Sequence, residues 1–470
     1  MRLKSIFTNS FGILFSRITG LGRDVLMASA LGASIWSDMF FVAFKLPNFF
    51  RRIFAEGAFT QAFMPSFVAS SNKGVFATAI FLRFLLFLLS FSLLITLFPE
   101  PITKALAWGW DSERIANTAT LTAINFWYLD LIFIVTFLAT LLQYKEHFAT
   151  TAMATALLNI AMITALWMYM KEDPQTVAYA LSFSVLAGGL LQVISHLIAI
   201  KQFNLHKLLI GGWKYRKKKD VVDEEKAFKA LFIPSIVGNS TPQISAFVDT
   251  LLATFLMTGS VSYLFYANRV FQLPLALIAI ATATVLFPSV SKALKNHQEA
   301  KAYENLNTAF WLLAFLLGGA TVGGILLAEP IVWLLFERYN FTVENTHETV
   351  IVLQMYMIGL LPFGLAKLFS MFLYASHRHL KAAKIAIYSL ITSVSFSLLL
   401  MNVMGASGLA LAGSIGGWVL FILTVREVGV NKFIRIIRSK KSLYFIFLIS
   451  ISSLLFYALN DLLITFIRHS

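Results

Sequence analysis

Apolar residues run along this chain in long uninterrupted stretches, and the short alternation typical of a β-barrel is missing. An α-helix needs about 20 such residues to cross a bilayer. Because lipid leaves no backbone group unpaired, the pattern predicts an all-α polytopic membrane protein. The predicted spans are thirteen, at about 6–31, 35–55, 75–98, 115–142, 150–170, 176–200, 228–256, 260–288, 305–328, 348–375, 382–402, 406–425 and 442–466.

The composition agrees with a membrane protein, and the sequence lacks the motifs of several enzyme classes. Hydrophobic residues make up 58% of 470 positions and charged residues 13%, against about 45–50% and 25% in soluble proteins. The chain has no cysteine, which excludes disulfides and thiol chemistry. No nucleotide-binding GxxxxGK[ST] loop and no HExxH zinc motif occurs. We therefore expect a protein that is not an enzyme, with no cofactor or metal; a monovalent ion or the membrane potential would drive any transport.

The basic residues predict how the chain is oriented. The net charge is +15, which in a soluble protein would suggest nucleic acid. Here Lys and Arg cluster in the loops after even-numbered spans, as at Arg51, Arg52 and the run Lys214 to Lys219. The positive-inside rule then places the N-terminus and these loops in the cytoplasm, with no nucleic acid as partner. An odd number of spans places Ser470 on the outer side.

The longest hydrophilic stretch divides the chain near its middle. We predict an N-terminal lobe at 1–202, a cytoplasmic amphipathic and basic linker at 203–227, a C-terminal lobe at 228–426, and an interfacial helix with a last span at 427–470. A faint repeat supports two related lobes, since the second span of each half carries Leu-Pro and then a Pro-Ser pair: Pro47 and Pro65, Pro274 and Pro288. Two six-helix lobes around a central cavity, plus one or two extra helices, are a common transporter plan.

Ionised side chains in or beside the first two spans are the main candidates for a binding site. A charge at bilayer depth costs at least about 2.5–3.5 kcal/mol, so it normally faces a protein-lined interior. Arginine grips phosphate with two parallel hydrogen bonds. The pairs Arg17–Asp24 and Asp38–Lys45 could instead be structural, which would leave three arginines without a local acid. The candidates are Arg17, Arg23, Asp24, Asp38, Arg51 and Arg52, of which one of the last two could be a simple interfacial anchor.

The second half adds two cations and one acid inside apolar stretches. Arg269 lies in the eighth span and Lys367 deep in the tenth. Asp249, in the seventh, is either a cation or proton site or a partner for Arg269. Asp130 and Asn159 are weaker candidates, since each could serve helix packing, and Arg83 is expected to snorkel to the interface.

The N-terminal region resembles the N-terminal signature of the MurJ (MviN) family in the MOP transporter superfamily. The motif that carries the resemblance is "RITGLGRDVLMASALGAS…SDMFFVAFKLPNFFRRIFAEGAFTQAFMPSF". The resemblance continues through "FVDTLLATFL", "YANRVFQLPLALIAIATATVLFPSVS" and "GLAKLFSMFLYA". It implies a lipid II flippase that moves an undecaprenyl-diphosphate-linked peptidoglycan precursor from the cytoplasmic to the periplasmic leaflet by alternating access. The family's cavity arginines fall on Arg17, Arg23, Arg51 and Arg269, and its cavity acid on Asp38.

The chain departs from the family's pattern at three places. Asn268 stands where an acid commonly precedes the arginine of the eighth span. A sodium site would need polar partners for Asp249, and only Ser393 and Ser397 occupy the aligned positions. The family usually has fourteen helices, the last two forming a groove for the lipid tail, whereas only one span follows the twelfth here.

Two other functions compete with this expectation. A multidrug or oligosaccharide-lipid exporter of the same superfamily would favour acids and aromatic rings in its cavity. A membrane glycosyltransferase would need a catalytic acid in a sizeable outer loop. We expect a flippase that is a monomer in the bacterial inner membrane, with lipid II and membrane lipids as its partners.

Overall fold

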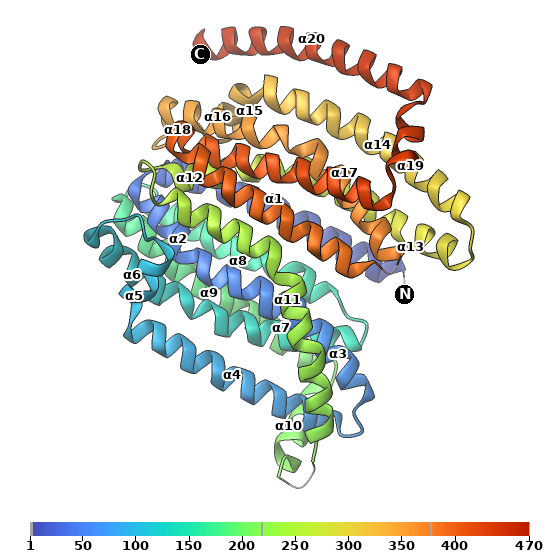
Figure 1. Ribbon diagram of the computed structural model, residues 1–470. Coiled ribbons are helices and arrows are strands. Elements are labelled where there is room, and N and C mark those ends of the chain that lie inside the picture. The colour runs from blue at the N-terminus through green and yellow to red at the C-terminus, as the bar shows by residue number, and fades with distance from the viewer. Residues whose placement is uncertain (1–2, 218–219, 377, 470) are drawn as a thin grey trace. The chain divides into compact units, whose positions relative to one another are not determined.

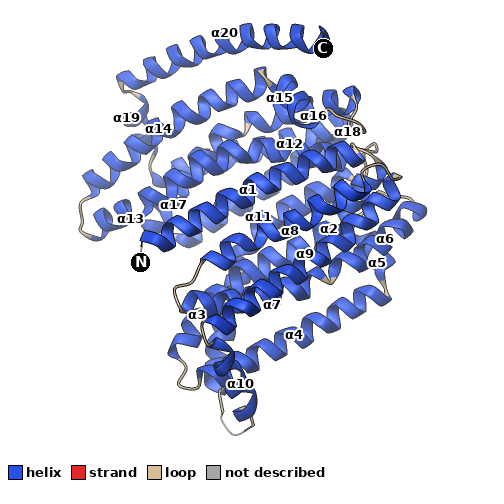
Figure 2. Ribbon diagram, turned by 180° about the vertical axis from the view of Figure 1, so that it is seen from behind, coloured by secondary structure: helices blue, strands red, loops and turns tan. Residues whose placement is uncertain are grey.

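The structure is a computed structural model that describes residues 3–217, 220–376 and 378–469, and these residues form helices and loops without a strand (Figures 1 and 2). The chain divides into two compact units, Met1–Phe247 and Val248–Ser470. The boundary falls inside one long helix, α11. Its residues from Val222 to Phe247 belong to unit 1, and the rest belong to unit 2. The all-helical fold predicted from the apolar stretches is confirmed.

Unit 1 is built from helices that pack mainly through α1 on α8, α8 on α9, and α2 on α6. Its elements are α1 (Leu3–Leu31), α2 (Ile35–Phe50), the π-helix η1 (Arg51–Phe59), α3 (Thr60–Ala69), α4 (Lys73–Leu97), α5 (Pro99–Leu106), α6 (Ser112–Phe126), α7 (Tyr128–Tyr144), α8 (Ala149–Tyr169), α9 (Pro174–Gln202), α10 (Leu205–Tyr215) and the first part of α11 (Val222–Ala253).

Unit 2 packs α17 on α18, α16 on α18, and α12 on α16. Its elements are the end of α11, α12 (Ser260–Pro274), the π-helix η2 (Leu275–Ile280), α13 (Ala281–Lys295), α14 (Glu299–Leu326), α15 (Ala328–Phe336), α16 (Val343–Ile358), α17 (Leu360–Ala375), α18 (His379–Val428), α19 (Val430–Ile437) and α20 (Lys440–His469).

Each predicted apolar stretch coincides with one helix or with consecutive helices. Among the described residues, eight helical segments are long and apolar enough to cross a membrane by length and composition. One of them, α18, contains both the eleventh and the twelfth predicted spans. Gly405 separates these two with φ 60° and ψ −135°, a conformation that only glycine adopts without strain.

The faint proline repeat has a structural counterpart. α2 contains Pro47 and passes into η1, just as α12 contains Pro274 and passes into η2. Proline removes one helical hydrogen bond and displaces the carbonyl four residues earlier, and such positions accommodate π-type turns. In each half the π-helix is followed by an α-helix with a second proline, Pro65 in α3 and Pro288 in α13.

The predicted hydrophilic linker contains a helix. α10 packs against α4, and the contact is close because a Cβ at Gly212 would overlap the backbone of Gly74. The exposed Trp213 ring carries the Arg216 guanidinium 3.6 Å from its centre. These features fit a helix at a lipid surface, and the lysines Lys218 and Lys219 of the predicted basic run lie outside the described residues.

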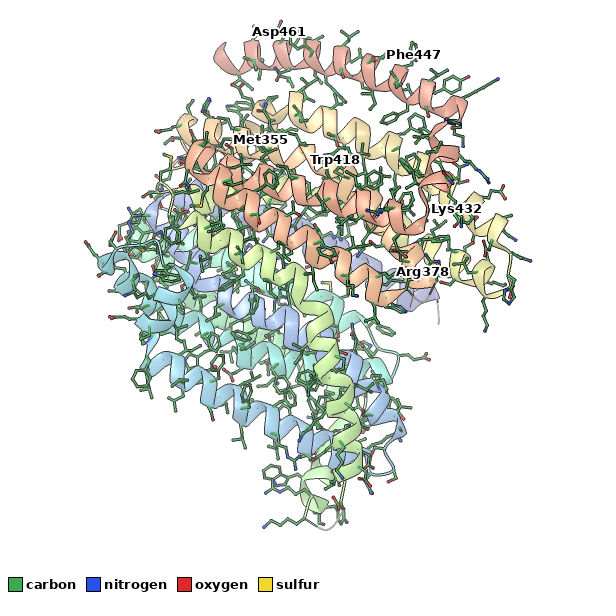
Figure 3. The ribbon with its side chains drawn as sticks, viewed as in Figure 1. Met355, Arg378, Trp418, Lys432, Phe447 and Asp461 are labelled. Atoms are coloured by element: carbon green, nitrogen blue, oxygen red, sulfur yellow. The ribbon has the colours of Figure 1, made fainter. Side chains whose placement is uncertain are left out.

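The C-terminal stretch forms a short helix, α19, and a long one, α20. In α19 the Phe433 ring packs among Phe310, Phe369 and Phe421, while Lys432 lies over the Tyr303 ring. α20 follows and packs against α14 and α15. Figure 3 shows Phe447 and Asp461 on this helix, whose apolar surface is largely exposed.

Candidate functional site

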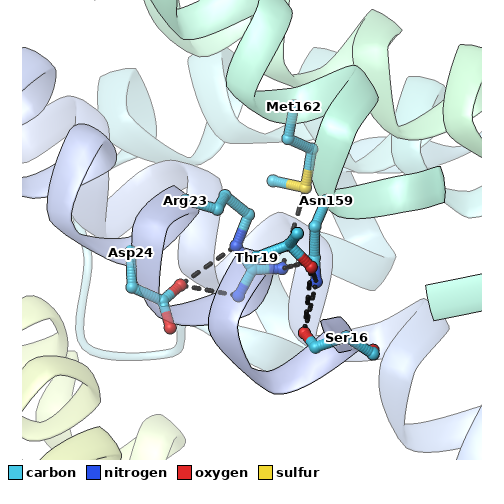
Figure 4. A network of polar contacts seen from close by, with 6 residues as sticks. All are labelled: Ser16, Thr19, Arg23, Asp24, Asn159 and Met162. Atoms are coloured by element: carbon cyan, nitrogen blue, oxygen red, sulfur yellow. Dashed lines mark hydrogen bonds and ion pairs between the residues drawn. The ribbon is translucent and has the colours of Figure 1, made fainter. Parts of the chain in front are cut away.

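Arg23 makes hydrogen bonds to side chains of two helices, α1 and α8. Its Nε and Nη2 donate to Asp24 Oδ1 at 3.0 and 2.6 Å, and its Nη1 donates to Asn159 Oδ1 at 3.1 Å (Figure 4). Arg23 and Asp24 are 8% and 3% exposed. The Asn159 amide in turn donates to the Ser16 carbonyl and to Thr19 Oγ1, at 3.0 and 3.2 Å. This network ties α1 to α8.

Small residues bring the two helices close enough for these contacts. A Cβ at Gly12 would lie 2.7 Å from the Cβ of Ala152, and one at Gly20 would lie 3.3 Å from Asn159 Nδ2. Helices in lipid associate through such close backbone approach and through side-chain hydrogen bonds, because lipid supplies no hydrophobic driving force between them. These glycines therefore allow α1 to pack closely against α8, and the polar network lies between the two helices.

The sequence-based pairing of these charges is wrong in one respect. Arg23 was expected to have no local acid, with Asp24 opposite Arg17, but it is Arg23 that forms the ion pair with Asp24. The reason is that a long guanidinium side chain can fold back along the helix onto its neighbour. Arg17 is exposed and makes no hydrogen bond or ion pair with any described residue.

Asp38 is buried in the first turn of α2. Ser34 caps that helix, accepting a hydrogen bond from the Ser37 backbone N–H, and the Ser37 hydroxyl accepts one from the backbone N–H of Ser34. A carboxylate in the first turn is stabilised by the positive end of the helix dipole. This placement accounts for a buried acid at this position.

Arg51 and Arg52 begin η1. Arg51 is half-buried, whereas Arg52 is exposed and its Nη1 lies 3.4 Å from Gln243 Oε1 of α11. The two neighbours thus differ in accessibility, although the sequence could not tell them apart. Isolated π-turns are frequent at functional sites, and this one places both cations at the end of the second predicted span.

In unit 2, Arg269 lies in the middle of α12 with its guanidinium carbon 4.7 Å from the centre of the Phe265 ring. It is half-buried. The preceding Asn268 accepts a hydrogen bond from Gln272 and is hydrogen-bonded to the Tyr356 hydroxyl, which lies in the electrostatic field of Asp249. Asn268 and Asp249 therefore both interact electrostatically with Tyr356 of α16.

The other predicted residues of unit 2 lie on α17 and α18. Lys367 is exposed on α17. Ser393 and Ser397 are buried in the part of α18 before Gly405. The Cβ of Ser393 packs against Gly416, in the part of α18 after Gly405. The described residues contain no group of three or more His, Cys, Asp or Glu side chains that could hold a metal ion.

Two further contacts involve residues for which the sequence predicted another role or none. Ser92 of α4 donates to Asp130 of α7 at 2.5 Å, and both are buried. Arg83, expected to snorkel, forms an ion pair with the buried Glu225 at the start of α11. Arg83 lies in a predicted span, whereas Glu225 lies in the predicted linker at 203–227. Residues 142 positions apart give no periodicity that would reveal such a pair.

A family model described as lipid II flippase MurJ matches residues 27–468. The match begins after Arg17, Arg23 and Asp24, so these three residues lie outside it. A probable lipid II flippase MurJ of Helicobacter pylori is 47% identical over 448 residues, covering 93% of this chain and 97% of the relative. One from Haemophilus influenzae is 34% identical over 408 residues, covering 82% and 78%.

Solved structures give the same picture of the fold. The structure titled lipid II flippase MurJ, inward closed conformation, has a TM-score of 0.79 and 25% identity, covering 96% of this chain and 97% of its own. An inward-facing multidrug resistance transporter of the MATE family in the MOP superfamily has a TM-score of 0.68 at 14% identity, covering 92% and 98%. The second likeness concerns the fold alone.

Proposed function

Because the chain belongs to the lipid II flippase MurJ family, we propose that it moves lipid II from the cytoplasmic to the periplasmic leaflet of the bacterial inner membrane. The observation that carries this proposal is the family match over nearly the whole chain, together with cations placed inside apolar helices of both units. Lipid II is an amphiphile with a diphosphate between its sugar head and its prenyl tail. A transporter for it needs positive charge in a wet interior and lets the tail stay in lipid.

We assign the diphosphate contacts to the cations that the structure leaves most accessible. Arg17, Arg52 and Lys367 are exposed, and Arg51 and Arg269 are half-buried. Each charge-assisted hydrogen bond to phosphate would contribute roughly 1.5–3 kcal/mol. Asp38 would balance these charges when no substrate is bound.

Arg23 and Asp24 receive a different role within the same proposal. The donors of Arg23 point to Asp24 and Asn159, and breaking such a buried pair to engage a substrate would cost several kcal/mol. We therefore infer that they position α1 on α8, which fixes the height of Arg17 on the exposed face of α1.

The energy for transport would come from an ion or from the membrane potential. Moving one negative charge towards the positive outer side gains about 2.3 kcal/mol per 100 mV, so the potential itself favours outward movement of a diphosphate. Asp249, whose charge acts on Tyr356, is the candidate for ion coupling, with Ser393 and Ser397 as the weaker candidates. The N-terminus would lie in the cytoplasm, and the protein would act as a monomer.

The test is to deplete the native protein in its own cells and to supply variants at native level. A membrane-impermeant amine reagent applied to spheroplasts then labels the lipid II that has reached the outer leaflet. Arg17→Ala should abolish labelling while the total lipid II pool rises. Arg338→Ala is the matched control, because this arginine is exposed and its side chain donates to the carbonyls of Leu334 and Leu335 in its own helical turn.

Two results would contradict the proposal. Full labelling in depleted cells would mean that another protein moves lipid II. Full labelling by an Arg17→Ala, Arg269→Ala double variant would remove the anion-binding role of these arginines and would favour the exporter alternative of the same superfamily.

A further inference from the structure

Unit 1 contains an apolar cleft that the proposed transport function does not use. It lies between α4, α7 and the N-terminal part of α11 and has a volume of about 290 Å³. That is near the lower end of the range for small-molecule sites, about 300–1,000 Å³. The cleft therefore has room for part of one hydrocarbon chain and none for a glycopeptide head.

Aromatic rings form the floor and walls of this cleft. Phe84 of α4 packs against Phe133 of α7 with ring centres 5.8 Å apart, and against Phe228 and Phe232 of α11 at 5.7 and 5.1 Å. Phe133 and Phe228 are fully buried. Such interlocked rings hold a fixed shape, so the cleft is a preformed feature of the packing.

The cleft opens towards the lipid-facing side of α4. Phe87, which lines it, is 62% exposed. Only 22% of the apolar window of α4 is buried inside the protein, so most of this helix meets lipid. An acyl chain can reach the cleft from the bilayer without passing through any interior of the protein.

The polar side chains that line the cleft are two cations, Arg83 and Lys229. Arg83 is ten residues from the start of α4 and Lys229 is seven from the start of α11, about 15 and 10 Å along the helices. Both side chains are long enough to reach the headgroup level. Arg83 is paired with Glu225, whereas Lys229 is exposed and forms no ion pair with any described residue. The mouth therefore has a net positive charge of one.

We propose that this cleft binds an acyl chain of an anionic glycerophospholipid, with the lipid phosphate at Lys229 and Arg83. The apolar rings match the chain, and the net positive mouth matches a headgroup that carries a net negative charge. On the predicted orientation the lipid comes from the cytoplasmic leaflet. A bound lipid would join α4 to the start of α11, the helix shared by the two units.

The absence of cysteine from the chain allows a site-specific test in the full-length protein. Phe87→Cys, labelled with a small fluorophore, is reconstituted in vesicles that contain phosphatidylglycerol or phosphatidylcholine with brominated acyl chains, which quench on contact. We expect stronger quenching by the brominated phosphatidylglycerol at equal mole fraction. Leu93→Cys, exposed elsewhere on α4, should be quenched equally by both lipids.

Charge variants in the Phe87→Cys background then test the mouth. Lys229→Gln should lower the preference for phosphatidylglycerol roughly fivefold, the effect of about one lysine at a membrane surface. The control is Lys226→Gln, one turn earlier on α11, which pairs with Asp223 and does not line the cleft. Both lysines are exposed, so neither change should prevent folding.

Three outcomes would overturn the proposal. Equal quenching by the two lipids at Phe87→Cys would remove the anionic preference. An unchanged preference in Lys229→Gln would move the headgroup elsewhere. Loss of quenching on adding equimolar undecaprenyl phosphate would assign the cleft to a prenyl tail. Failure of lipid II transport itself would leave all three readouts unaffected, so the two proposals are tested separately.

Discussion

Arg23 of unit 1 and Arg269 of unit 2 both lie in apolar helices, yet they are held in different ways. Arg23 is sealed between α1 and α8 with its donors directed at Asp24 and Asn159. Arg269 is half-buried and rests against the Phe265 ring. The comparison teaches that an intramembrane arginine is not by itself an anion ligand, because the same residue type also fastens helices together.

The largest effect is expected from Arg23→Ala. Removing one partner of a buried ion pair leaves the other charge uncompensated, at a cost of about 3–5 kcal/mol. Thermal unfolding of the purified protein in detergent should therefore shift strongly downwards. The double variant Arg23→Met, Asp24→Leu removes both charges and should recover most of the lost stability. A stable Arg23→Ala protein that fails only in transport would break the comparison and make Arg23 a substrate ligand.

Arg269→Ala should have the opposite profile. We expect native thermal stability but a roughly tenfold to hundredfold loss of lipid II affinity, from one charge-assisted contact of about 1.5–3 kcal/mol. Binding of lipid II to the purified variant measures the affinity, and thermal unfolding in detergent measures the stability. The leaflet assay in cells reports transport. Arg269→Lys keeps the charge without the bidentate geometry, so its lipid II affinity should lie between those of the native protein and Arg269→Ala. Unchanged affinity together with lower stability would place Arg269 in the same class as Arg23.

A smaller effect is expected from Asn159→Ala. The amide satisfies Arg23, the Ser16 carbonyl and Thr19, so its loss leaves buried polar groups unpaired, at about 1–3 kcal/mol. Thr164→Ala on the same helix is the control, since this exposed hydroxyl donates to the Ile160 carbonyl of its own helix. Equal unfolding temperatures for the two variants would show that the network contributes little beyond the Arg23–Asp24 pair.

The smallest effect is expected at the opposite end of the chain from α1. α20 is a single long apolar helix after the short basic α19, so one further crossing should bring the C-terminus to the periplasm. A short tag after Ser470 should leave transport unchanged and react with an impermeant reagent in spheroplasts. Reaction only after the inner membrane is permeabilised would place the C-terminus in the cytoplasm.

The sequence by itself determined the all-helical membrane class and the family. Apolar runs of bilayer length have one solution in lipid, the helix, so the thirteen stretches fell on helices. The paired prolines likewise indicated two related halves, because proline acts on the local backbone and needs no distant partner. The break between the eleventh and twelfth predicted spans, both within α18, also lies at a glycine, Gly405, which interrupts the apolar run.

Only the tertiary structure decided which charges pair and which remain accessible. Arg17 and Arg23 stand on one helix and look alike in the sequence, but Asn159, 136 positions away from Arg23, fixes one and leaves the other exposed. Arg83 and Glu225 meet in the same way, on the edge of a cleft between three helices. Helical periodicity specifies a face of each helix, whereas the partner of a charge depends on which helices pack together, and that is set by side-chain shape over the whole unit.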